Sequence, residues 1–229
     1  MKTVKFLFVL LFILSTPLQL FGRVTESAEN LLHVIHRVNR HWQENNSPQV
    51  RSFWDNAAYH TGNMEVYELT GNTAYLKYST DWAEYNHWKG AASDNKAEWR
   101  YGYGETPQYV LFGDWQCCFQ TYADLYGIRG DDRKIARARE VMEYQMGTDK
   151  NDYWWWADGL YMVMPVMTKL HRITKNPLYL EKLYEYFSYA DSVMYDPEVG
   201  LYYRDGSFVY PKHSILGGKK DFWARGDGW

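Results

Sequence analysis

The chain has 229 residues, of which 46% are hydrophobic, 23% are charged and 18% are aromatic. This composition is typical of a globular protein and excludes a disordered chain, collagen and a coiled coil. The formal net charge of −3 excludes a broad cationic surface, so nucleic acid is not an expected partner. The 11 Trp, 21 Tyr and 10 Phe exceed what packing alone requires, and we expect some of these rings to line a binding site.

The first residues have the pattern of an export signal. Lys2 and Lys5 precede an unbroken apolar run, Phe6 to Leu14, which is too short to span a bilayer. We therefore expect a signal peptide over residues 1–22 and a single domain over residues 23–229. The protein is then expected to be exported, either to the periplasm or as a secreted protein, without membrane association once the signal is removed.

The cysteines and histidines predict neither a disulfide nor a metal site. The only cysteines are the neighbours Cys117 and Cys118, whose Cα atoms lie about 3.8 Å apart, closer than a disulfide usually requires. We expect two buried thiols, so the core alone must hold an exported chain together. No cluster of Cys, His and carboxylate residues has the spacing of a structural zinc site, and we expect no metal and no other cofactor.

Apolar spacing predicts a series of helices separated by short stop-and-start segments. The first expected helix begins at Thr25, the second runs from Phe53 to Leu69, and the third contains Tyr75 to Ala83. The fourth runs from Gln108 to Tyr126 and the fifth begins after Gly130-Asp131. The sixth runs from Ala157 to Ile173 and the seventh follows Pro177. Gly71 suits the left-handed residue that ends a helix, and Asn72 can cap the next one. A short β-hairpin is expected within Gly200 to Tyr210, about Asp205-Gly206. Repeating helical hairpins stack into a solenoid or close into a ring.

The even-numbered helices share Trp beside Asp at their N-terminal ends. The four clusters are Phe53-Trp54-Asp55-Asn56, Gly113-Asp114-Trp115-Gln116, Trp154-Trp155-Trp156-Ala157-Asp158 and Phe222-Trp223-Ala224-Arg225-Gly226-Asp227-Gly228-Trp229. If the even helices form an inner ring, all four clusters face one end of a central cavity. Indole rings stack on the C–H face of a sugar while carboxylates bind its hydroxyls, so this arrangement predicts a carbohydrate site. For any single cluster, an Asp that caps a helix beside a core Trp is the simpler interpretation.

Asp158 is the strongest candidate for a catalytic group. Three Trp residues precede it and apolar residues follow it, so its surroundings should be apolar. Burial raises the pKa of a carboxyl group and keeps a proton available for donation near neutral pH. We therefore expect Asp158 to act as a general acid. Asp114 is the expected second carboxylate, which holds substrate or water; a charge that only stabilises a helix N-terminus is its alternative role.

Three motifs have the order and spacing of a known family. They are Trp156-Ala-Asp158-Gly-Leu-Tyr-Met-Val-Met-Pro165, Tyr195-Asp-Pro-Glu-Val-Gly-Leu-Tyr-Tyr203 and Trp223-Ala-Arg-Gly-Asp-Gly-Trp229. They resemble the unsaturated rhamnogalacturonyl hydrolases, glycoside hydrolase family 105, and the resemblance extends from about Phe53. It implies an all-α fold, the (α/α)6 toroid, whose six hairpins need twelve helices. Because we count seven helices and the start of an eighth, we expect an incomplete ring and a C-terminally truncated chain.

The resemblance also implies a reaction. Members of that family remove a 4,5-unsaturated uronic acid from the non-reducing end of lyase-generated pectin or rhamnogalacturonan oligosaccharides. An Asp protonates the vinyl ether carbon and activates water to add at the neighbouring carbon, and the resulting hemiketal collapses; this departs from the usual two-carboxylate scheme. Asp158 matches the acid/base and Asp114 matches a second acidic position, while Arg225 suits the substrate carboxylate. The expected sugar-binding rings are Trp54, Trp115, Trp156, Trp223 and Trp229.

Two positions depart from the family pattern. Asp227 stands where the family usually has Asn, so that an amide donor becomes a carboxylate that repels an anionic substrate. Tyr203-Arg204-Asp205 stands where many members carry His-Gly, and a different substrate preference is expected. Two other functions stay open from the residues themselves. One is a conventional inverting glycosidase with Asp114 and Asp158 as base and acid; the other is a noncatalytic sugar-binding protein or an inactive fragment.

Overall fold

A computed structural model describes residues 27–229 and divides the chain into two compact units, Met1–Ser47 and Pro48–Trp229. The described part of the first unit contains one helix over residues 27–45, in agreement with the first predicted helix. The expected signal peptide over residues 1–22 lies outside the described residues. Within the described part of the chain, no helix is both long enough and apolar enough to cross a membrane.

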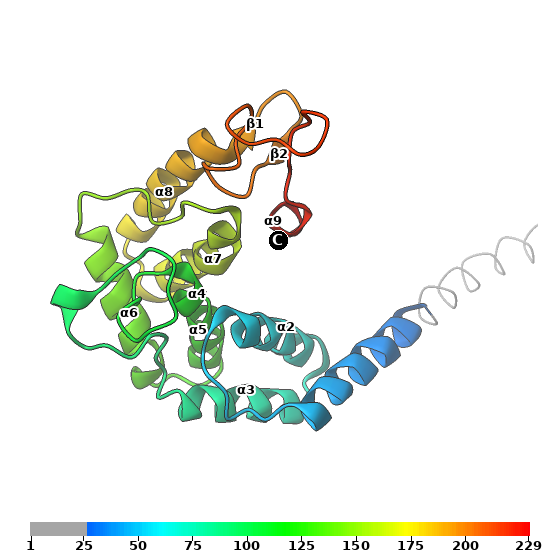
Figure 1. Cartoon of the computed structure of the whole chain (residues 1–229). Helices are drawn as coiled ribbons and strands as arrows, with labels where there is room; N and C mark the ends of the chain where they lie inside the picture. Colours follow the sequence, from blue (N-terminus) through cyan, green and yellow to red (C-terminus); the bar gives the residue numbers. More distant parts are fainter. Residues whose placement is uncertain (1–26) are drawn as a thin grey trace, which may run out of the picture. The chain divides into compact units, whose positions relative to one another are not determined.

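The second unit consists of helices and two very short strands (Figure 1). Its elements are α2 (Trp54–Thr70), α3 (Thr73–Tyr85), the 3-10 helix η1 (Lys96–Glu98), α4 (Gly113–Gln116), α5 (Cys118–Ile128), α6 (Arg133–Met146), α7 (Ala157–Thr174), α8 (Leu178–Met194), β1 (Tyr195–Asp196), β2 (Leu201–Tyr202) and α9 (Ala224–Gly228). Consecutive helices pack as the pairs α2–α3, α5–α6 and α7–α8, and the pairs join where α5 contacts α2 and α7. This places α2, α5, α7 and α9 in an inner layer and α3, α6 and α8 in an outer layer, as the sequence predicted.

The helix boundaries follow the predicted capping residues. Gly71 ends α2 with a left-handed φ of 67°, and its N–H donates to the carbonyl oxygen of Tyr67. The side chain of Asn72 then caps α3 by accepting a hydrogen bond from Ala74 N at 3.0 Å. Pro177 stands directly before α8, where its missing N–H leaves no helical bond unmade.

The fourth predicted helix starts later than the sequence indicates. Residues 108–112 are not helical because their backbone pairs with that of Arg100, whose carbonyl accepts a hydrogen bond from Leu111 N at 3.0 Å. The helix begins at Gly113 as α4 and continues as α5 after a one-residue interruption at Cys117, whose φ and ψ remain helical. The prediction of a helix from Gln108 was therefore wrong at its start.

A side chain of α5 repairs a break in the hydrogen bonding of α7. Pro165 lies inside α7 and has no N–H to donate to the carbonyl oxygen of Tyr161. Gln120 of α5 donates instead, from Nε2 to Tyr161 O at 2.9 Å and to Met162 O at 3.0 Å. This contact satisfies the freed carbonyl and joins two inner helices, one of which carries Asp158 at its start.

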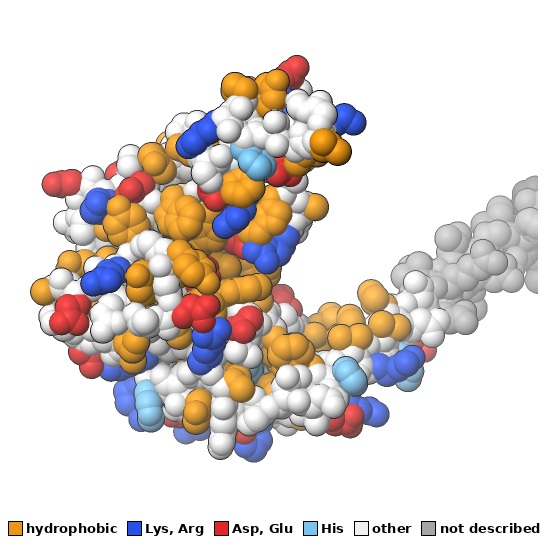
Figure 2. Space-filling view, viewed as in Figure 1, with side chains coloured by type: hydrophobic (Ala, Val, Ile, Leu, Met, Phe, Trp, Pro, Cys, Tyr) orange, Lys and Arg blue, Asp and Glu red, His pale blue; other side chains and the backbone are white. Residues whose placement is uncertain are grey.

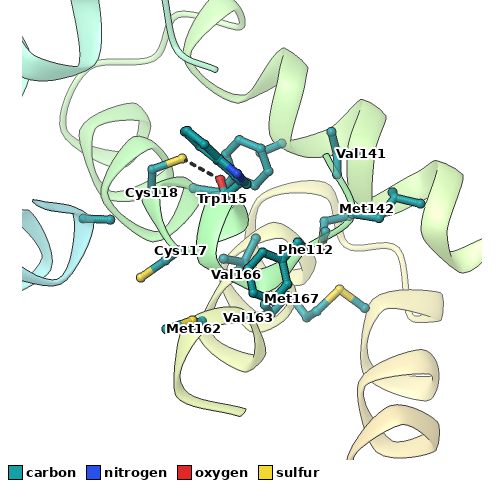
Figure 3. Close-up of a cluster of buried hydrophobic side chains, with 14 of the residues drawn as sticks. Phe112, Trp115, Cys117, Cys118, Val141, Met142, Met162, Val163, Val166 and Met167 are labelled. Atoms are coloured by element: carbon teal, nitrogen blue, oxygen red, sulfur yellow. Dashed lines mark hydrogen bonds between the residues drawn. The ribbon is translucent and has the colours of Figure 1, made fainter. Parts of the chain in front are cut away.

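The core of the second unit lies where α4 and α5 meet α6 and α7 (Figure 3). Burial of its apolar side chains supplies the main driving force for folding. The side chains drawn there include Phe112, Val141, Met142, Met162, Val163, Val166 and Met167. Cys117 and Cys118 are buried free thiols within this core, as predicted, and Cys118 Sγ donates to the carbonyl oxygen of Trp115 at 3.2 Å.

The predicted β-hairpin forms earlier in the chain than expected. β1 pairs with β2 in antiparallel register, so the turn spans residues 197–200 and not Asp205-Gly206. Asp196 stabilises this turn because its Oδ1 accepts hydrogen bonds from two backbone N–H groups, and Gly200 supplies the left-handed φ of 77°. Asp205 instead forms an isolated antiparallel bridge with Trp156. The bridge brings the segment after β2 to the start of α7.

Candidate active site

Asp158 is a buried carboxyl with one cationic partner. It lies in the first turn of α7, and only 2% of the residue is exposed. Its Oδ2 accepts a hydrogen bond from Arg225 Nη2 at 2.8 Å, whereas its Oδ1 has no partner within the described part of the chain. Burial raises the pKa of Asp158, and the positive charge of Arg225 opposes that shift. An apolar environment around this acid, inferred from its sequence neighbours, is therefore present.

Asp114, in α4, is a second buried carboxyl at the same place. It is 6% exposed, and its Oδ1 also lacks a hydrogen-bond partner among the described residues. Burial raises the pKa of Asp114 to about 7, with a further contribution from the negative charge of Asp158; the charge of Arg225 acts in the opposite direction. The two carboxyls therefore titrate as neighbours, and Asp114 retains a proton near neutral pH.

Arg225 bonds Asp158 and also contacts two aromatic rings, one at the start of α2 and one just before α9. Its guanidinium lies 4.2 Å from the ring centroid of Trp223 and 5.2 Å from that of Trp54. Trp229 completes this group, with its ring centroid 6.4 Å from that of Trp54 and 4.0 Å from that of Tyr161 in α7. Figure 2 shows a hollowed part of the surface in which hydrophobic side chains adjoin basic and acidic ones. Helices α2, α4, α7 and α9 thus contribute to one site.

Two of the predicted sugar-binding rings lie behind this surface rather than on it. Trp115 is 8% exposed and packs edge-on against Phe53, while its Nε1 donates to the carbonyl oxygen of Gly104. Trp156 is 6% exposed and packs against Phe112 at a centroid distance of 4.9 Å. The Trp156 ring lies against Gly113 and Gly159, the residues next to Asp114 and Asp158, and it contributes to the apolar surroundings of both acids.

Asp227 makes a structural hydrogen bond between α9 and the β-hairpin. Its Oδ1 accepts a hydrogen bond from the backbone N–H of Tyr202 at 2.7 Å, which ties α9 to β2. The carboxylate at this position therefore has a structural partner within the protein. Asp227 is exposed, and the repulsion of an anionic substrate that its charge would cause stays a prediction.

Sequence reasoning assigned no role in the site to the loop before α4. Within this loop the Tyr103 O–H donates to Glu105, which also forms an ion pair with Arg51. The carbonyl oxygen of Gly104 in this loop accepts a hydrogen bond from Trp115 Nε1 at 3.2 Å, so the loop contacts the helix that carries Asp114. A Gly-rich segment carries no periodicity, and its approach to Asp114 was therefore not predictable from spacing.

Sequence comparisons place the chain among carbohydrate-active proteins. The model of Glycosyl Hydrolase Family 88 matches residues 28–229. An unsaturated 3S-rhamnoglycuronyl hydrolase of Formosa agariphila is 27% identical over 188 residues, which cover 77% of this chain and 48% of that protein. A protein of the same name from Alteromonas sp. (strain LOR) is 34% identical over 76 residues, covering 33% of this chain and 18% of that one.

Similar folds occur among solved structures. A family 88 glycosyl hydrolase from Bacteroides vulgatus is 70% identical, with a TM-score of 0.87, and the match covers 88% of this chain and 58% of that one. A protein named as a polysaccharide lyase is also 70% identical, with a TM-score of 0.86 and coverage of 89% and 57%. A family 105 glycoside hydrolase from C. acetobutylicum, 20% identical with a TM-score of 0.56 and coverage of 80% and 52%, shares the fold.

The chain thus spans about half the length of the Formosa relative and less than two thirds of the two highly similar structures. Its helical pairs have the arrangement of the six-hairpin (α/α)6 glycosidase fold, which confirms the predicted all-α class. With a family match that extends over nearly all of the described residues, the chain belongs to glycosyl hydrolase family 88.

Proposed function

We propose that the chain forms part of a glycoside hydrolase that removes a 4,5-unsaturated uronic acid from the non-reducing end of pectin or rhamnogalacturonan oligosaccharides. The observation that carries this proposal is the buried carboxyl of Asp158, which has one unpartnered oxygen and a guanidinium beside it. The names of the two curated relatives, both unsaturated 3S-rhamnoglycuronyl hydrolases, support an unsaturated uronide as substrate.

In the proposed reaction, Asp158 donates its proton to the electron-rich vinyl ether carbon of the sugar. Positive charge then develops at the neighbouring carbon, and a water molecule adds there while returning a proton to the Asp158 carboxylate. The resulting hemiketal opens and releases the attached sugar. In this proposal Asp114, whose pKa is raised to about 7, binds a sugar hydroxyl or the water. Arg225 retains guanidinium N–H groups for the substrate carboxylate, because its side chain is half-exposed and bonds Asp158 through Nη2.

A second candidate function is polysaccharide lyase activity on a uronate linkage. It is favoured by the solved structure that is named a polysaccharide lyase and is 70% identical to this chain. In such an elimination a base removes the proton next to the uronate carboxylate, the bond from the ring to the leaving oxygen breaks, and an acid protonates that oxygen. Asp114 and Asp158 supply one base and one acid, and Arg225 would neutralise the carboxylate. The two candidate reactions therefore need the same groups. The hydrolase consumes an alkene, whereas the lyase forms one.

One assay separates these functions. The purified protein is incubated with lyase-generated unsaturated oligosaccharides and, separately, with saturated uronate-containing polysaccharides, while the ultraviolet absorbance of the alkene is followed. We expect the absorbance to fall with the unsaturated oligosaccharides; a rise with the saturated ones would instead establish the lyase. Release of reducing sugar from saturated glycosides without any alkene signal, with inversion of the anomeric configuration in the first product, would indicate an inverting glycosidase. Sugar binding that Asp158→Asn leaves intact, with no turnover of any substrate, would indicate a noncatalytic protein.

We also propose that the protein is exported and that residues 23–229 belong to one catalytic domain. Export is supported by the charged and apolar pattern of the first residues. N-terminal sequencing of the protein recovered from the periplasm or the medium tests the expected cleavage after Gly22. An uncleaved N-terminus in the recovered protein would contradict it.

A further inference from the structure

We infer that Trp156 is a positioning residue of this site, whose indole ring sets the distance between the helix that carries Asp114 and the helix that carries Asp158. The inference rests on the proposed function, in which both acids act in one reaction. It gives Trp156 a role that needs no contact with a sugar, and such a role suits a residue that is only 6% exposed.

The two acids occupy equivalent places in their helices. Phe112 is the N-cap of α4 and Trp156 is the N-cap of α7. Asp114 and Asp158 each follow their cap by two residues. The rings of the two cap residues pack against each other with a centroid distance of 4.9 Å and an interplanar angle of 33°. One aromatic contact therefore joins the starts of both helices, close to both acids in the chain.

Two glycines let the Trp156 ring come close to both helices. A Cβ atom added at Gly113, directly before Asp114, would lie 2.9 Å from Cη2 of this ring. A Cβ atom added at Gly159, directly after Asp158, would lie 3.4 Å from the same Cη2 and 3.2 Å from Cζ3. The outer edge of the indole thus fills the space that a side chain at Gly113 would need. A change in the size of the ring should therefore change the spacing of α4 and α7.

The Trp156 ring has little freedom to move aside. Trp155 packs against it at a centroid distance of 4.9 Å, and Phe112 lies at the same centroid distance. The backbone of Trp156 is paired with that of Asp205 in the antiparallel bridge. In a well-packed interior, even one added methyl group forces its neighbours to shift. The ring therefore acts as a rigid spacer between the two helices.

The spacing of the acids matters because each acts on the other. Burial raises the pKa of Asp114 to about 7, and the negative charge of Asp158 adds to that shift. Other charges that act on the two acids are those of Arg225, Arg204, Glu105 and Asp55. Replacement of one apolar ring by another alters none of these charges. A resulting change in the pKa of Asp114 then reports the spacing of the acids or their access to water.

Trp156→Phe tests the spacer directly. A phenyl ring ends short of the position of Cη2 and leaves a space beside two carboxyls, each of which has one oxygen without a partner among the described residues. Water should enter a space with polar neighbours and lower the pKa of Asp114. By carbon-13 NMR of the free protein, we expect that pKa to fall by about one unit. In alkene consumption, we expect kcat to fall about 10- to 100-fold while KM changes by less than about threefold.

Gly113→Ala tests the same contact from the other side. Its Cβ overlaps the indole edge, so this variant should also lower kcat. The phenyl ring of Trp156→Phe vacates that edge, and we expect the double variant to have a higher kcat than Gly113→Ala alone. Gly159→Ala should lower kcat less than Gly113→Ala, because its contacts with the ring, at 3.2 to 3.4 Å, are longer.

Two controls match these substitutions. Trp82→Phe makes the same change at a fully buried indole of α3, and Gly62→Ala adds a Cβ in α2 that meets no atom within 4 Å apart from its own helix. Both controls should leave kcat and the pKa of Asp114 unchanged. Circular dichroism shows which variants are folded. If Trp156→Phe is not folded, Gly113→Ala and Gly159→Ala carry the test through the same ring edge.

Three results would overturn the inference. A higher KM with an unchanged kcat in Trp156→Phe would assign the ring to sugar binding. An unchanged kcat together with an unchanged pKa of Asp114 would show that the ring does not set the geometry of the acids. Strictly additive effects of Gly113→Ala and Trp156→Phe on ln kcat would show that the two residues act separately. Absence of alkene consumption by the unmutated chain counts against the proposed function instead, and the NMR titration then still decides the inference.

Discussion

Buried carboxyl groups at the two ends of the inner helices differ in their hydrogen-bond partners. Where α4 and α7 begin, Asp114 and Asp158 each leave one carboxyl oxygen without a hydrogen-bond partner among the described residues. Toward the other end of the same layer, Asp124 of α5 accepts a hydrogen bond from Lys169 of α7 at 2.6 Å. Burial raises the pKa of Asp124 too, but the adjacent Lys169 opposes that shift. The protein therefore pairs the buried carboxylate of Asp124 closely, whereas Asp114 and Asp158 each keep one oxygen without a partner in the described part of the chain, near the rings of Trp54 and Trp223.

Buried polar groups without a hydrogen-bond partner destabilise a folded protein, whereas a buried ion pair offsets much of the cost of burying its two charges. The contrast indicates that the end with Asp124 and Lys169 contributes to stability, whereas the end with Asp114 and Asp158 keeps polar atoms available for a reaction. Substitutions should separate these roles: changes at the first end should lower activity, and changes at the second should lower the free energy of unfolding.

The largest effect is expected for Asp158→Asn. An amide cannot donate an acidic proton, so the rate of alkene consumption should fall by roughly 100- to 10,000-fold. Asp124→Asn is the matched control, since it makes the same chemical change at the paired end and should leave the rate within a few fold of the unmutated protein. Rates are compared at saturating substrate by alkene absorbance. A residual rate within tenfold for Asp158→Asn would remove the distinction between the two ends.

Asp114→Asn should alter the pH dependence of stability. In the folded protein the pKa of Asp114 is about 7, above that of an unfolded aspartate, so the folded state binds the proton more tightly. Its contribution to stability is therefore present at low pH and is lost as pH rises from about 4 to about 7. Above pH 7 we expect the free energy of unfolding of the asparagine variant to be about 2 to 4 kcal/mol higher than that of the unmutated protein. Urea unfolding at pH 4 and pH 8 measures this difference.

His60 provides an opposing reference in the same titration. Burial lowers its pKa to about 3, and its ring stacks on Trp82 at a centroid distance of 4.0 Å. Its contribution is present above the unfolded pKa of a histidine and is lost as pH falls toward about 3. Loss of the Asp114 trend should therefore make the stability of the variant fall less, or rise more, between pH 4 and pH 7 than that of the unmutated protein. An equal pH dependence of stability in the two proteins would show that Asp114 is not the titrating group.

At the paired end, Lys169→Met should lower stability rather than activity. It leaves Asp124 buried without its cation, and we expect the free energy of unfolding to fall by about 1 to 3 kcal/mol at pH 7. Adding Asp124→Leu should restore much of the loss, because the double variant has no buried charge. Urea midpoints and slopes measure both changes. If Lys169→Met alone lowers the rate of alkene consumption by more than tenfold, the proposed separation of roles is incorrect.

The smallest effect is expected at the contact between Gln120 of α5 and the backbone of α7. Gln120→Leu removes the donor to Tyr161 O, and we expect a loss of about 1 kcal/mol. Pro165→Ala supplies a backbone N–H for the same carbonyl, so Gln120→Leu should cost less in that background. A double-mutant cycle with urea unfolding measures the difference. Strictly additive losses would show that the glutamine does not compensate for the proline.

Much of the helical framework was predictable because its determinants are local. Gly71 and Asn72 act within one turn of the boundary that they define, and the apolar spacing of α6 and α7 recurs within each helix. The approach of Asp114, Asp158 and Arg225 was also accessible, since equivalent ends of repeated hairpins meet at one side of a ring. Repetition made a tertiary prediction possible from local signals.

The remaining features depend on backbone pairings between distant segments. The backbone of Arg100 pairs with residues that were predicted to begin the fourth helix. Asp205, predicted to lie in the hairpin turn, instead pairs with Trp156. Neither pairing leaves a periodic signal in the sequence. The same applies to Arg204: the departure from His-Gly marked its position, but only the contact with Ala157 places it beside the acid.

The contact of Arg225 with two indoles has an optical consequence. The guanidinium of Arg225 lies against Trp54 and Trp223, and we expect the proposed uronate ligand to draw the cation away from both rings and so to change their emission. Occupancy of the site should then be visible as a change in intrinsic tryptophan emission, without any added dye. Tryptophan emission would therefore follow binding of the proposed ligand directly.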